Sequence, residues 1–502
     1  MTNENLYHFF ERKFPADKSR TAFELPSGKT YSFQDLQDTS GRFANYLIES
    51  GAKPGDRVAV QVHKTVEAVF LYLACLRSGL VYLPLNTAYK SAEIDYFLSD
   101  ASPAVLVCDP SNRTELLDIA TKAGVSNVLT LDKEGQGSLI SNSGGHSSEF
   151  DTTIRTGEDL AAILYTSGTT GRSKGAMLTH NNLASNAQSL VKAWEFEESD
   201  VLLHALPIFH VHGLFVALHC AFLSGNKVIF LSKFDADEVI DTLPKATVFM
   251  GVPTFYVRLL ASQKFGKESC HNMRLFTAGS APLLEDTFNE FTARTGHTIL
   301  ERYGMSEAGM ITSNPYNGER IAGSVGFPLD NQVRISDEQG NIVKDGDIGI
   351  LEIKGPNVFK GYWNMPEKTA AEFRPDGYFI TGDMIRKDEK GYYRIVGRSK
   401  DLVISGGYNV YPKEIESYLD EMPGVLESAV VGRPHPDFGE AVVAFIVLDG
   451  ENSVTEQDVI DFVKDKLANF KVPKQVFITK ELPRNTMGKV QKNELRARAQ
   501  PD

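Results

Sequence analysis

Short apolar runs alternate with helical stretches along most of this chain, and that alternation restricts its fold more than any other feature. Between residues 32 and 132, the runs RVAVQV, VYLPL and AVLVC separate longer segments with helical periodicity. The same pattern resumes at ILYT (residues 163–166) and continues to TILERYG (residues 298–304). Strands that alternate with helices form mostly parallel sheets covered by helices. The sequence therefore predicts two α/β subdomains in succession.

Other segments differ from these subdomains in composition and in their predicted secondary structure. Residues 133–157 are poor in apolar residues and rich in Gly and Ser, which predicts a flexible connection between the subdomains. Between residues 323 and 398, short strands separated by Gly, Asp and Asn predict hairpins in a small β subdomain. The order of helical and strand-like segments in the tail fits a separate α+β domain. We therefore expect an N-terminal domain over residues 1–397, built from the two α/β subdomains and the β subdomain, and a smaller, mobile C-terminal domain over residues 398–502.

The charge balance and the cysteines argue against several classes of protein. Lys and Arg number 52 and Asp and Glu number 65, a net charge of −13 that disfavours general binding to nucleic acid or to anionic membranes. The four cysteines have no C-x-x-C spacing, which predicts a reduced, cytoplasmic location. The N-terminus has no basic start followed by an apolar run, so we expect no signal peptide. Four histidines and Pro207 interrupt the apolar stretch 201–223, which predicts a loop and a buried helix rather than a membrane span.

The segment YTSGTTGRSKG (residues 165–175) carries the strongest chemical signal. It contains five Ser and Thr hydroxyls, glycines that let backbone N–H groups approach a ligand, and two cations, and it follows an apolar strand directly. These groups suit a polyphosphate. The segment is not a Walker A loop, because the spacing G-x-x-x-x-G-K-[ST] is absent there. A solvated hairpin loop is the alternative, but the ordered mixture of hydroxyls, glycines and cations favours phosphate binding.

With the residues that follow it, this segment resembles the signature loop of the adenylate-forming superfamily, which includes acyl-CoA synthetases, peptide-synthetase adenylation domains and firefly-type luciferases. Further motifs match in the family's order, so the resemblance covers nearly the whole chain. They are ERYGMSE (301–307), YFITGD (378–383), GRSKD (397–401) with SGG (405–407), and PRNTMGK (483–489). The stretches HALPIFHVHGLF, GVPTFYVRLL, FTAGSAPL and GGYNVYPKEIE are similar to malonyl-CoA synthetases in particular.

The resemblance implies an AMP-forming acid–thiol ligase that uses ATP, Mg²⁺ and CoA. In such an enzyme a carboxylate of malonate attacks the α-phosphorus of ATP, pyrophosphate leaves, and the thiol of CoA then displaces AMP from malonyl-adenylate. Two alternatives stay open: a CoA ligase for methylmalonate or another small acid, and a non-catalytic nucleotide-binding protein. An adenylation module that loads a carrier protein is less consistent with a chain that ends at Asp502 without a carrier-like segment.

The matching motifs also imply which residues bind the nucleotide. They are Thr166, Ser167, Gly168, Thr169, Thr170, Gly171, Lys174, Gly279, Ser280, Ala281, Glu301, Arg302, Tyr303, Gly304, Met305, Ser306, Asp383 and Arg398. Within this set, the resemblance implies that Tyr303 stacks on adenine and that Asp383 contacts the ribose. Glu307, a catalytic residue by resemblance, would hold Mg²⁺ together with Thr166. A lone Glu, Asp or Arg is more often a solvated surface residue, so these roles depend on the motifs.

The resemblance assigns further roles in the tail. Lys489 corresponds to the catalytic lysine of adenylation, and Asp401 to the hinge around which the C-terminal domain turns to admit CoA. Gly406 and Gly407 would lie beside the pantetheine arm of CoA, because a residue without a Cβ allows such a close approach. Acylation of Lys489 by a regulatory enzyme would remove its charge and is expected to stop the reaction.

The second carboxylate of malonate requires a cation in its pocket, because an unpaired buried charge is costly. Arg258, which interrupts the apolar segment GVPTFYVRLL, is the first candidate, since Arg binds a carboxylate through two parallel hydrogen bonds. Arg302 is the second candidate, and Ser280 is a neighbouring donor. The alternatives are a solvated surface arginine for Arg258 and a structural ion pair for Arg302.

Two histidines lie close together in the segment FHVHG. His210 is predicted to line the pocket beside the carboxylate that reacts, and to take part in catalysis. His212 is predicted to be a buried core residue. A zinc site is not favoured, because no third ligand with suitable spacing is near.

Overall fold

In the computed structural model the chain divides into two compact units. The first contains Met1–Gln332 and Ile353–Phe379, and the second contains Val333–Glu352 and Ile380–Asp502. The structure describes residues 2–166, 173–281, 283–405, 408–435, 439–450, 454–464, 466–467, 469–485 and 488–500. Among these residues no helix is long and apolar enough to cross a membrane.

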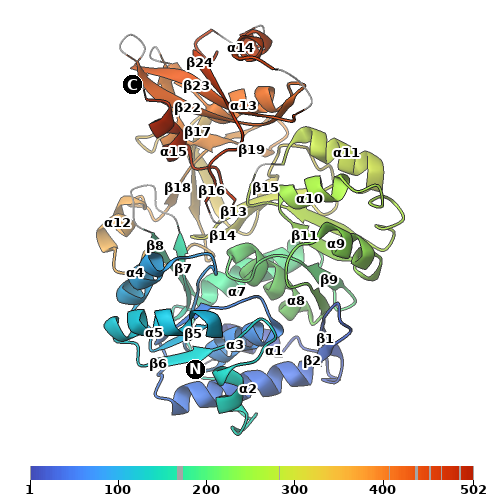
Figure 1. The fold of residues 1–502 in the computed structure, drawn as a ribbon, viewed down its shortest axis with the longest axis vertical. Coiled ribbons are helices and arrows are strands. Elements are labelled where there is room, and N and C mark those ends of the chain that lie inside the picture. Colours follow the sequence, from blue (N-terminus) through green and yellow to red (C-terminus); the bar gives the residue numbers. More distant parts are fainter. Residues whose placement is uncertain are drawn as a thin grey trace. The chain divides into compact units, whose positions relative to one another are not determined.

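A six-stranded sheet forms the first α/β subdomain (Figure 1). Its strands are β3 (Arg57–Gln61), β4 (Val81–Pro84), β5 (Val105–Cys108), β6 (Asn127–Thr130), β7 (Leu160–Thr166) and β8 (Lys174–Thr179). They lie in the order β6-β5-β3-β4-β7-β8, and only the β7–β8 pair is antiparallel. Its helices, with the N-terminal α1, are α1 (Leu6–Glu11), α2 (Phe33–Glu49), α3 (Val66–Arg77), α4 (Ser91–Ala101), α5 (Arg113–Lys122) and α6 (Ser138–Ser143). Every residue of β4 and β5 is buried, as expected for parallel strands covered on both faces.

A nine-stranded sheet forms the second α/β subdomain. Its strands are β1 (Thr21–Glu24), β2 (Thr30–Ser32), β9 (Val201–His204), β10 (Lys227–Phe230), β11 (Val248–Gly251), β12 (Leu275–Ala278), β13 (Leu300–Met305), β14 (Gly309–Ser313) and β15 (Phe327–Pro328). They lie in the order β15-β14-β13-β12-β11-β9-β10-β1-β2, and the run from β13 to β1 is parallel throughout. The helices of this part are α7 (His180–Ala193), α8 (His219–Ser224), α9 (Ala236–Thr242), α10 (Pro253–Leu260) and α11 (Glu285–Thr295). Helix α12 (Pro366–Ala371) follows a segment that pairs with β8 of the first sheet.

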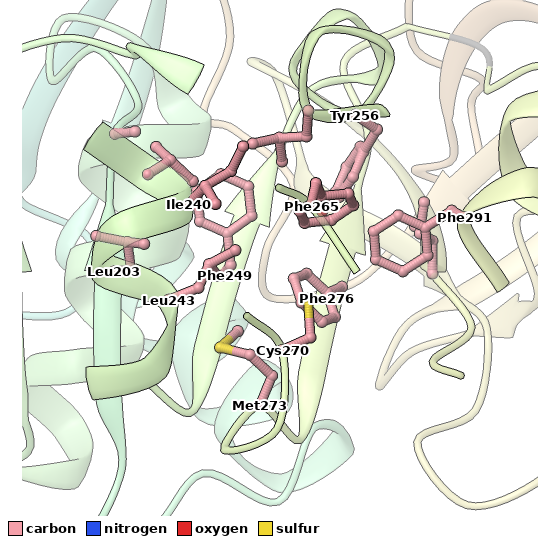
Figure 2. Close-up of a cluster of buried hydrophobic side chains, with 14 of the residues drawn as sticks. Leu203, Ile240, Leu243, Phe249, Tyr256, Phe265, Cys270, Met273, Phe276 and Phe291 are labelled. Carbon is pink, nitrogen blue, oxygen red and sulfur yellow. The ribbon is translucent and has the colours of Figure 1, made fainter. Parts of the chain in front are cut away.

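Large side chains from α9, α10 and α11 pack on one face of this second sheet (Figure 2). Phe291 of α11 meets Phe276 of β12 edge to face, with ring centroids 5.0 Å apart, and meets Tyr256 of α10 in the same way at 5.4 Å. Tyr256 is fully buried, and its hydroxyl donates a hydrogen bond to the carbonyl of Thr277 at 2.6 Å. This core therefore fixes the carboxyl end of β12, where several predicted site residues follow.

The second unit contains two smaller sheets. One has the order β16-β17-β18-β19, with β16 (Gln332–Ser336), β17 (Ile348–Lys354), β18 (Phe379–Lys387) and β19 (Tyr393–Arg398). The other consists of β20 (Val403–Ser405), β21 (Tyr408–Val410), β22 (Val425–His435), β23 (Gly439–Leu448) and β24 (Gln475–Thr479). The helices of this unit are α13 (Pro412–Asp420), α14 (Glu456–Lys464) and α15 (Lys492–Arg498). The four-stranded sheet thus groups with the tail rather than with the two α/β subdomains.

These elements confirm the predicted fold class, a large N-terminal α/β part and a smaller C-terminal part. The domain boundary at residues 397 and 398 and the mobility of the tail stay predictions. The apolar stretch 201–223 differs in detail from its prediction, because it begins with strand β9 before the loop. After the loop, a π-helix over His212–Leu218 runs directly into α8.

Candidate active site

Thr166 and Lys174 stand opposite each other where the predicted phosphate-binding loop leaves the sheet. Thr166 ends β7, Lys174 begins β8, and the two residues are paired in register. Five predicted contacts between them, Ser167, Gly168, Thr169, Thr170 and Gly171, lie outside the described residues. The structure therefore defines the two ends of this loop, each of which carries a side chain suited to a phosphate.

Glu307 lies directly beyond β13 and reaches the same place. Its carboxylate is buried and accepts from the Thr166 hydroxyl at 3.4 Å and from the Tyr362 hydroxyl at 3.1 Å. Burial raises the pKa of Glu307 above its usual value. No group of three His, Cys, Asp or Glu that suits a metal exists among the described residues. A carboxylate and a hydroxyl nevertheless fit Mg²⁺, which takes its remaining ligands from water and phosphate oxygens.

Lys174 is held by two residues that the sequence did not single out. Its ammonium lies 3.1 Å from a carboxylate oxygen of Glu372 and 4.1 Å from the centre of the Tyr362 ring. The Tyr362 hydroxyl also donates to Glu372 at 2.7 Å. A single Tyr and a single Glu outside the signature motifs give no sequence signal, because only the fold brings them to the loop.

The backbone beyond β12 passes closely over Arg302. A Cβ on Gly279 would lie 2.3 Å from Nη1 of Arg302, so only glycine fits there. Ser280 follows with a φ of +71°, a left-handed conformation that residues other than glycine seldom adopt and that occurs most often at functional sites. The Ser280 hydroxyl lies 3.4 Å from Nδ1 of His212, and Ala281 next to it is exposed.

Arg302 is a buried cation in β13. Only 3% of its surface is exposed, and its Nε and Nη2 have no hydrogen-bond partner among the described residues. Burial lowers its pKa from 12.5 to about 10. Buried polar groups are nearly always paired, and an unpaired buried charge is costly. Among the residues that the structure describes, Arg302 therefore forms no structural ion pair, and an anionic ligand would satisfy this guanidinium.

His212 lies beside Ser280 and is more than a core residue. It is the first residue of the π-helix, a rare conformation that occurs frequently at functional sites. Its Nε2 has no partner among the described residues, and burial, followed by the nearby Arg302 charge, lowers its pKa well below the usual value. His210 is partly buried, and its Nδ1 accepts from the backbone N–H of His212 at 3.3 Å. His212 therefore lies beside Ser280, and His210 lies beside His212.

The other predicted residues of the first unit lie in varied surroundings. Arg258, in the last turn of α10, is exposed. Glu301 is buried, and its carboxylate accepts from the backbone N–H of Gly323 at 2.9 Å. Tyr303 is buried, whereas Gly304, Met305 and Ser306 are partly exposed. Burial thus distinguishes the two candidate arginines, because Arg302 lacks contact with water and Arg258 does not.

A cavity of about 290 Å³ opens in the first unit at the carboxyl ends of strands from both sheets. Its lining is mostly apolar, carries no acidic residue and includes His63, Lys64 and Lys233. The Lys64 ammonium donates to the carbonyls of His204 and Leu231 at 2.9 and 2.5 Å, and burial lowers its pKa. Ligands of α/β proteins bind preferentially at the carboxyl ends of strands. The cavity is therefore suited to an anionic ligand with an apolar body.

In the second unit, two predicted residues form an ion pair. Asp383 of β18 is buried, and Nε of Arg398 on the adjacent β19 lies 2.8 Å from its carboxylate. Asp401 pairs with Arg496 of α15 at 2.6 Å. Lys489 is exposed, and its backbone N–H donates to the side chain of Asn485 at 2.9 Å. Gly406 and Gly407 lie outside the described residues.

Two family models match this chain. The model described as "AMP-binding enzyme" matches residues 10–363, and the model described as "AMP-binding enzyme C-terminal domain" matches residues 414–489. The chain belongs to the AMP-binding enzyme family. This membership confirms the superfamily predicted from the sequence motifs.

Several AMP-binding enzymes are similar over nearly the full length. The crystal structure of ATP-bound MatB from Rhodopseudomonas palustris superposes with a TM-score of 0.96, is 55% identical, and is matched over 99% of both chains. Malonate–CoA ligase of Arabidopsis thaliana is 34% identical over 93% of this chain and 84% of its own length. Long-chain-fatty-acid–CoA ligase of Bacillus subtilis is 33% identical over 96% of this chain and 92% of its own length.

Proposed function

We propose that this chain is an AMP-forming ligase that joins malonate to CoA through malonyl-adenylate. The choice of malonate rests on Arg302. Its guanidinium is buried, and two of its nitrogens have no hydrogen-bond partner among the described residues. A monocarboxylic acid would leave this charge unpaired, whereas the distal carboxylate of malonate would neutralise it through two hydrogen bonds. The 34% identity to a malonate–CoA ligase supports the same acid, and the 55% identity to ATP-bound MatB supports ATP as the nucleotide.

Arg302, Ser280 and His212 form the proposed acid pocket. Ser280 and His212 are joined at 3.4 Å, and Arg302 lies beneath the adjacent Gly279 backbone. Arg258 is the alternative clamp for the distal carboxylate, although its exposed position lets water compete for the same charge. We assign His210 to the reacting carboxylate, because it neighbours His212 at 3.3 Å.

The adenylation step needs positive charge and hydrogen-bond donors around the phosphates. A carboxylate oxygen of malonate forms a bond to the α-phosphorus of ATP, and the bond from that phosphorus to the bridging oxygen breaks, which releases pyrophosphate. Thr166 and Lys174 donate to the departing phosphates, and Glu307 with Thr166 would hold Mg²⁺. Bound there, Mg²⁺ would neutralise charge on the phosphate oxygens.

The remaining nucleotide and CoA contacts follow from the motifs. Tyr303 stacks on adenine, and Asp383 with Arg398 binds the ribose in this proposal. Lys489 stabilises the phosphoryl charge during adenylation, and Asp401 is the hinge between the two half-reactions. Acylation of Lys489 would then stop adenylation, and the enzyme is proposed to work in the cytoplasm.

The cavity beside Lys64 is proposed to receive CoA. By the motifs alone, Gly406 and Gly407 are proposed to contact the pantetheine arm. Phe209 lines this cavity and directly precedes His210 in the chain. Its apolar walls suit the pantetheine arm, and Lys64 and Lys233 suit an anionic group of CoA.

A pyrophosphate-release assay over a panel of acids tests the proposal. With ATP, Mg²⁺ and CoA, malonate should give malonyl-CoA, AMP and pyrophosphate, and butyrate and long-chain fatty acids should be poor substrates. Methylmalonate is the second candidate, because it carries the same distal carboxylate, and its relative rate shows whether the pocket excludes a methyl group. Release of ADP and phosphate, or faster reaction with fatty acids, would refute the proposal. No turnover with any acid, together with ATP binding, would favour the non-catalytic alternative.

A further inference from the structure

Tyr362 and Glu372 connect the two charged groups at the ends of the phosphate-binding loop. The Tyr362 hydroxyl lies 3.1 Å from the Glu307 carboxylate and 2.7 Å from that of Glu372. Glu372 accepts from the Lys174 ammonium at 3.1 Å, and this ammonium lies over the Tyr362 ring at 4.1 Å. We refer to Lys174, Glu307, Tyr362 and Glu372 as the Tyr362 cluster. Its four side chains form one continuous network beside the loop.

The backbone fixes Tyr362 relative to the strand that carries Lys174. Tyr362 forms an isolated β-bridge with Ala176 of β8, and the next residue, Trp363, donates its N–H to the carbonyl of Gly175 at 2.7 Å. The N–H of Tyr362 donates to the side chain of Thr369 at 2.9 Å. A Cβ on Gly175 would lie 3.3 Å from Cβ of Trp363 and 2.9 Å from the Ile163 side chain of β7, so glycine leaves room for the Tyr362 segment beside β8. These contacts hold the Tyr362 backbone beside β8.

The hydrogen-bond chemistry gives Tyr362 and Glu372 different tasks. A hydroxyl has one hydrogen, so Tyr362 donates to one carboxylate at a time. Glu372 has two cations to balance it, Lys174 and Lys368, the latter at 2.9 Å. Among the described residues Glu307 has no ion-pair partner, and its donors are the hydroxyls of Tyr362 and Thr166. Tyr362 thus connects Glu307 to Glu372 through one shared hydrogen, and Glu372 holds the Lys174 ammonium.

We propose that Tyr362 and Glu372 are positioning residues that keep the Lys174 ammonium and the Glu307 carboxylate in the arrangement that the phosphate chain of ATP requires. The inference rests on the proposed function only in taking ATP as the ligand of this loop. Neither residue needs to contact the reacting atoms. Their effect is to prevent Lys174, a long and flexible side chain, from adopting other rotamers before ATP arrives.

The test measures ATP affinity by titration calorimetry, without an acid or CoA. Glu372→Gln removes the charge that holds Lys174, and Tyr362→Phe removes the hydroxyl but keeps the ring. Each should weaken ATP binding about tenfold, the loss expected for one hydrogen bond to a charged group. Tyr362→Leu should weaken it further, because the ring beneath the ammonium is also lost. Glu367→Gln is the control, because Glu367 is exposed on α12, the helix that ends directly before Glu372, and this variant should bind ATP as the unaltered protein does.

The outcomes separate positioning from competition and from a purely structural role. Tighter or unchanged ATP binding by Glu372→Gln would mean that Glu372 only competes with phosphate for Lys174, and would overturn the inference. A lower melting temperature of the Tyr362 variants with unchanged ATP affinity would also overturn it, because a structural residue predicts that result. Thermal unfolding of the ligand-free proteins provides this comparison.

A double-mutant cycle provides a second readout. If Glu372 acts through Lys174, Glu372→Gln should weaken ATP binding far less in a Lys174→Gln background than in the unaltered protein. Equal effects in both backgrounds would refute the connection. If the unaltered protein bound no ATP, the proposed function would fail together with the inference. Normal ATP binding by the unaltered protein, with unaffected variants, would overturn the inference alone.

Discussion

Replacing Arg302 by Met should maintain or raise the stability of the ligand-free protein and lower its activity with malonate. The structure buries this guanidinium without an anionic partner among the described residues, and burial lowers its pKa from 12.5 to about 10. From this pKa shift, burial of the charge lowers the free energy of unfolding at neutral pH by about 3 kcal/mol. Methionine fills a similar volume without a charge. The ligand-free variant should therefore unfold at the same temperature as the unaltered protein or at a higher one.

The same change should severely impair the reaction of malonate. Once malonate is bound, its distal carboxylate would be buried without a counter-charge, a loss of about 3–5 kcal/mol. In kcat/KM this corresponds to a decrease of roughly 150-fold to 5,000-fold. Butyrate has a methyl group where malonate has the distal carboxylate. Its kcat/KM should change little or increase, because the pocket no longer holds an unmatched cation.

The assay compares kcat/KM for malonate and butyrate in the unaltered protein, Arg302→Met and Arg258→Leu, with thermal unfolding of each. A loss specific to malonate in Arg302→Met, with a smaller loss in Arg258→Leu, is the expected result. Equal losses for both acids in Arg302→Met, or a decrease of several degrees in its melting temperature, would show that Arg302 supports the fold. A larger malonate-specific loss in Arg258→Leu would assign the distal carboxylate to α10.

Three further predictions concern other parts of the molecule. Lys489→Ala should reduce pyrophosphate release on the order of 100-fold, while chemically supplied malonyl-adenylate should still react with CoA. Asp401→Pro should impair the reaction of malonyl-adenylate with CoA and spare pyrophosphate release. Equal loss of both steps in both variants would refute these separate roles. Lys64→Met should raise the KM for CoA at least severalfold and leave adenylation unchanged, whereas an unchanged KM for CoA would exclude the cavity as its site. His219, fully buried against Tyr72, has its pKa lowered to about 3, so it takes up a proton only on unfolding and stability is lost as the pH falls below the unfolded value near 6.5. In urea denaturation between pH 6.5 and 5, His219→Gln should therefore lose about 1 kcal/mol less per pH unit than the unaltered protein, and equal slopes would contradict the assignment.

Local sequence patterns predicted most strands and helices of the two α/β subdomains, because an apolar run flanked by helical periodicity reports burial on both faces of a sheet. The order in which the strands pair could not be predicted from the sequence. Strands β1 and β2 come first in the chain, yet β1 pairs with β10, with Phe23 opposite Val228. A pairing across two hundred residues depends on how the intervening helices pack, which a local pattern does not contain. The π-helix at His212 is equally invisible, since its extra residue per turn leaves no separate composition signal.

At the candidate site, the motifs predicted which residue types are present, and burial in the structure showed which of the two arginines requires an anionic partner. Arg258 and Arg302 are chemically identical in the sequence, and Arg258 was the first choice because it interrupts an apolar helix. In the structure α10 is amphipathic, and its exposed side accommodates an arginine without cost. Strand β13 has no such side at Arg302, so the guanidinium there is costly to bury and is not repaid by a carboxylate of the described residues. A fold keeps such a charge at a cost to its own stability, and binding of an anionic substrate offsets that cost. The same reasoning accounts for Glu307 and Lys174, whose partners Tyr362 and Glu372 become visible only when burial and distance are known.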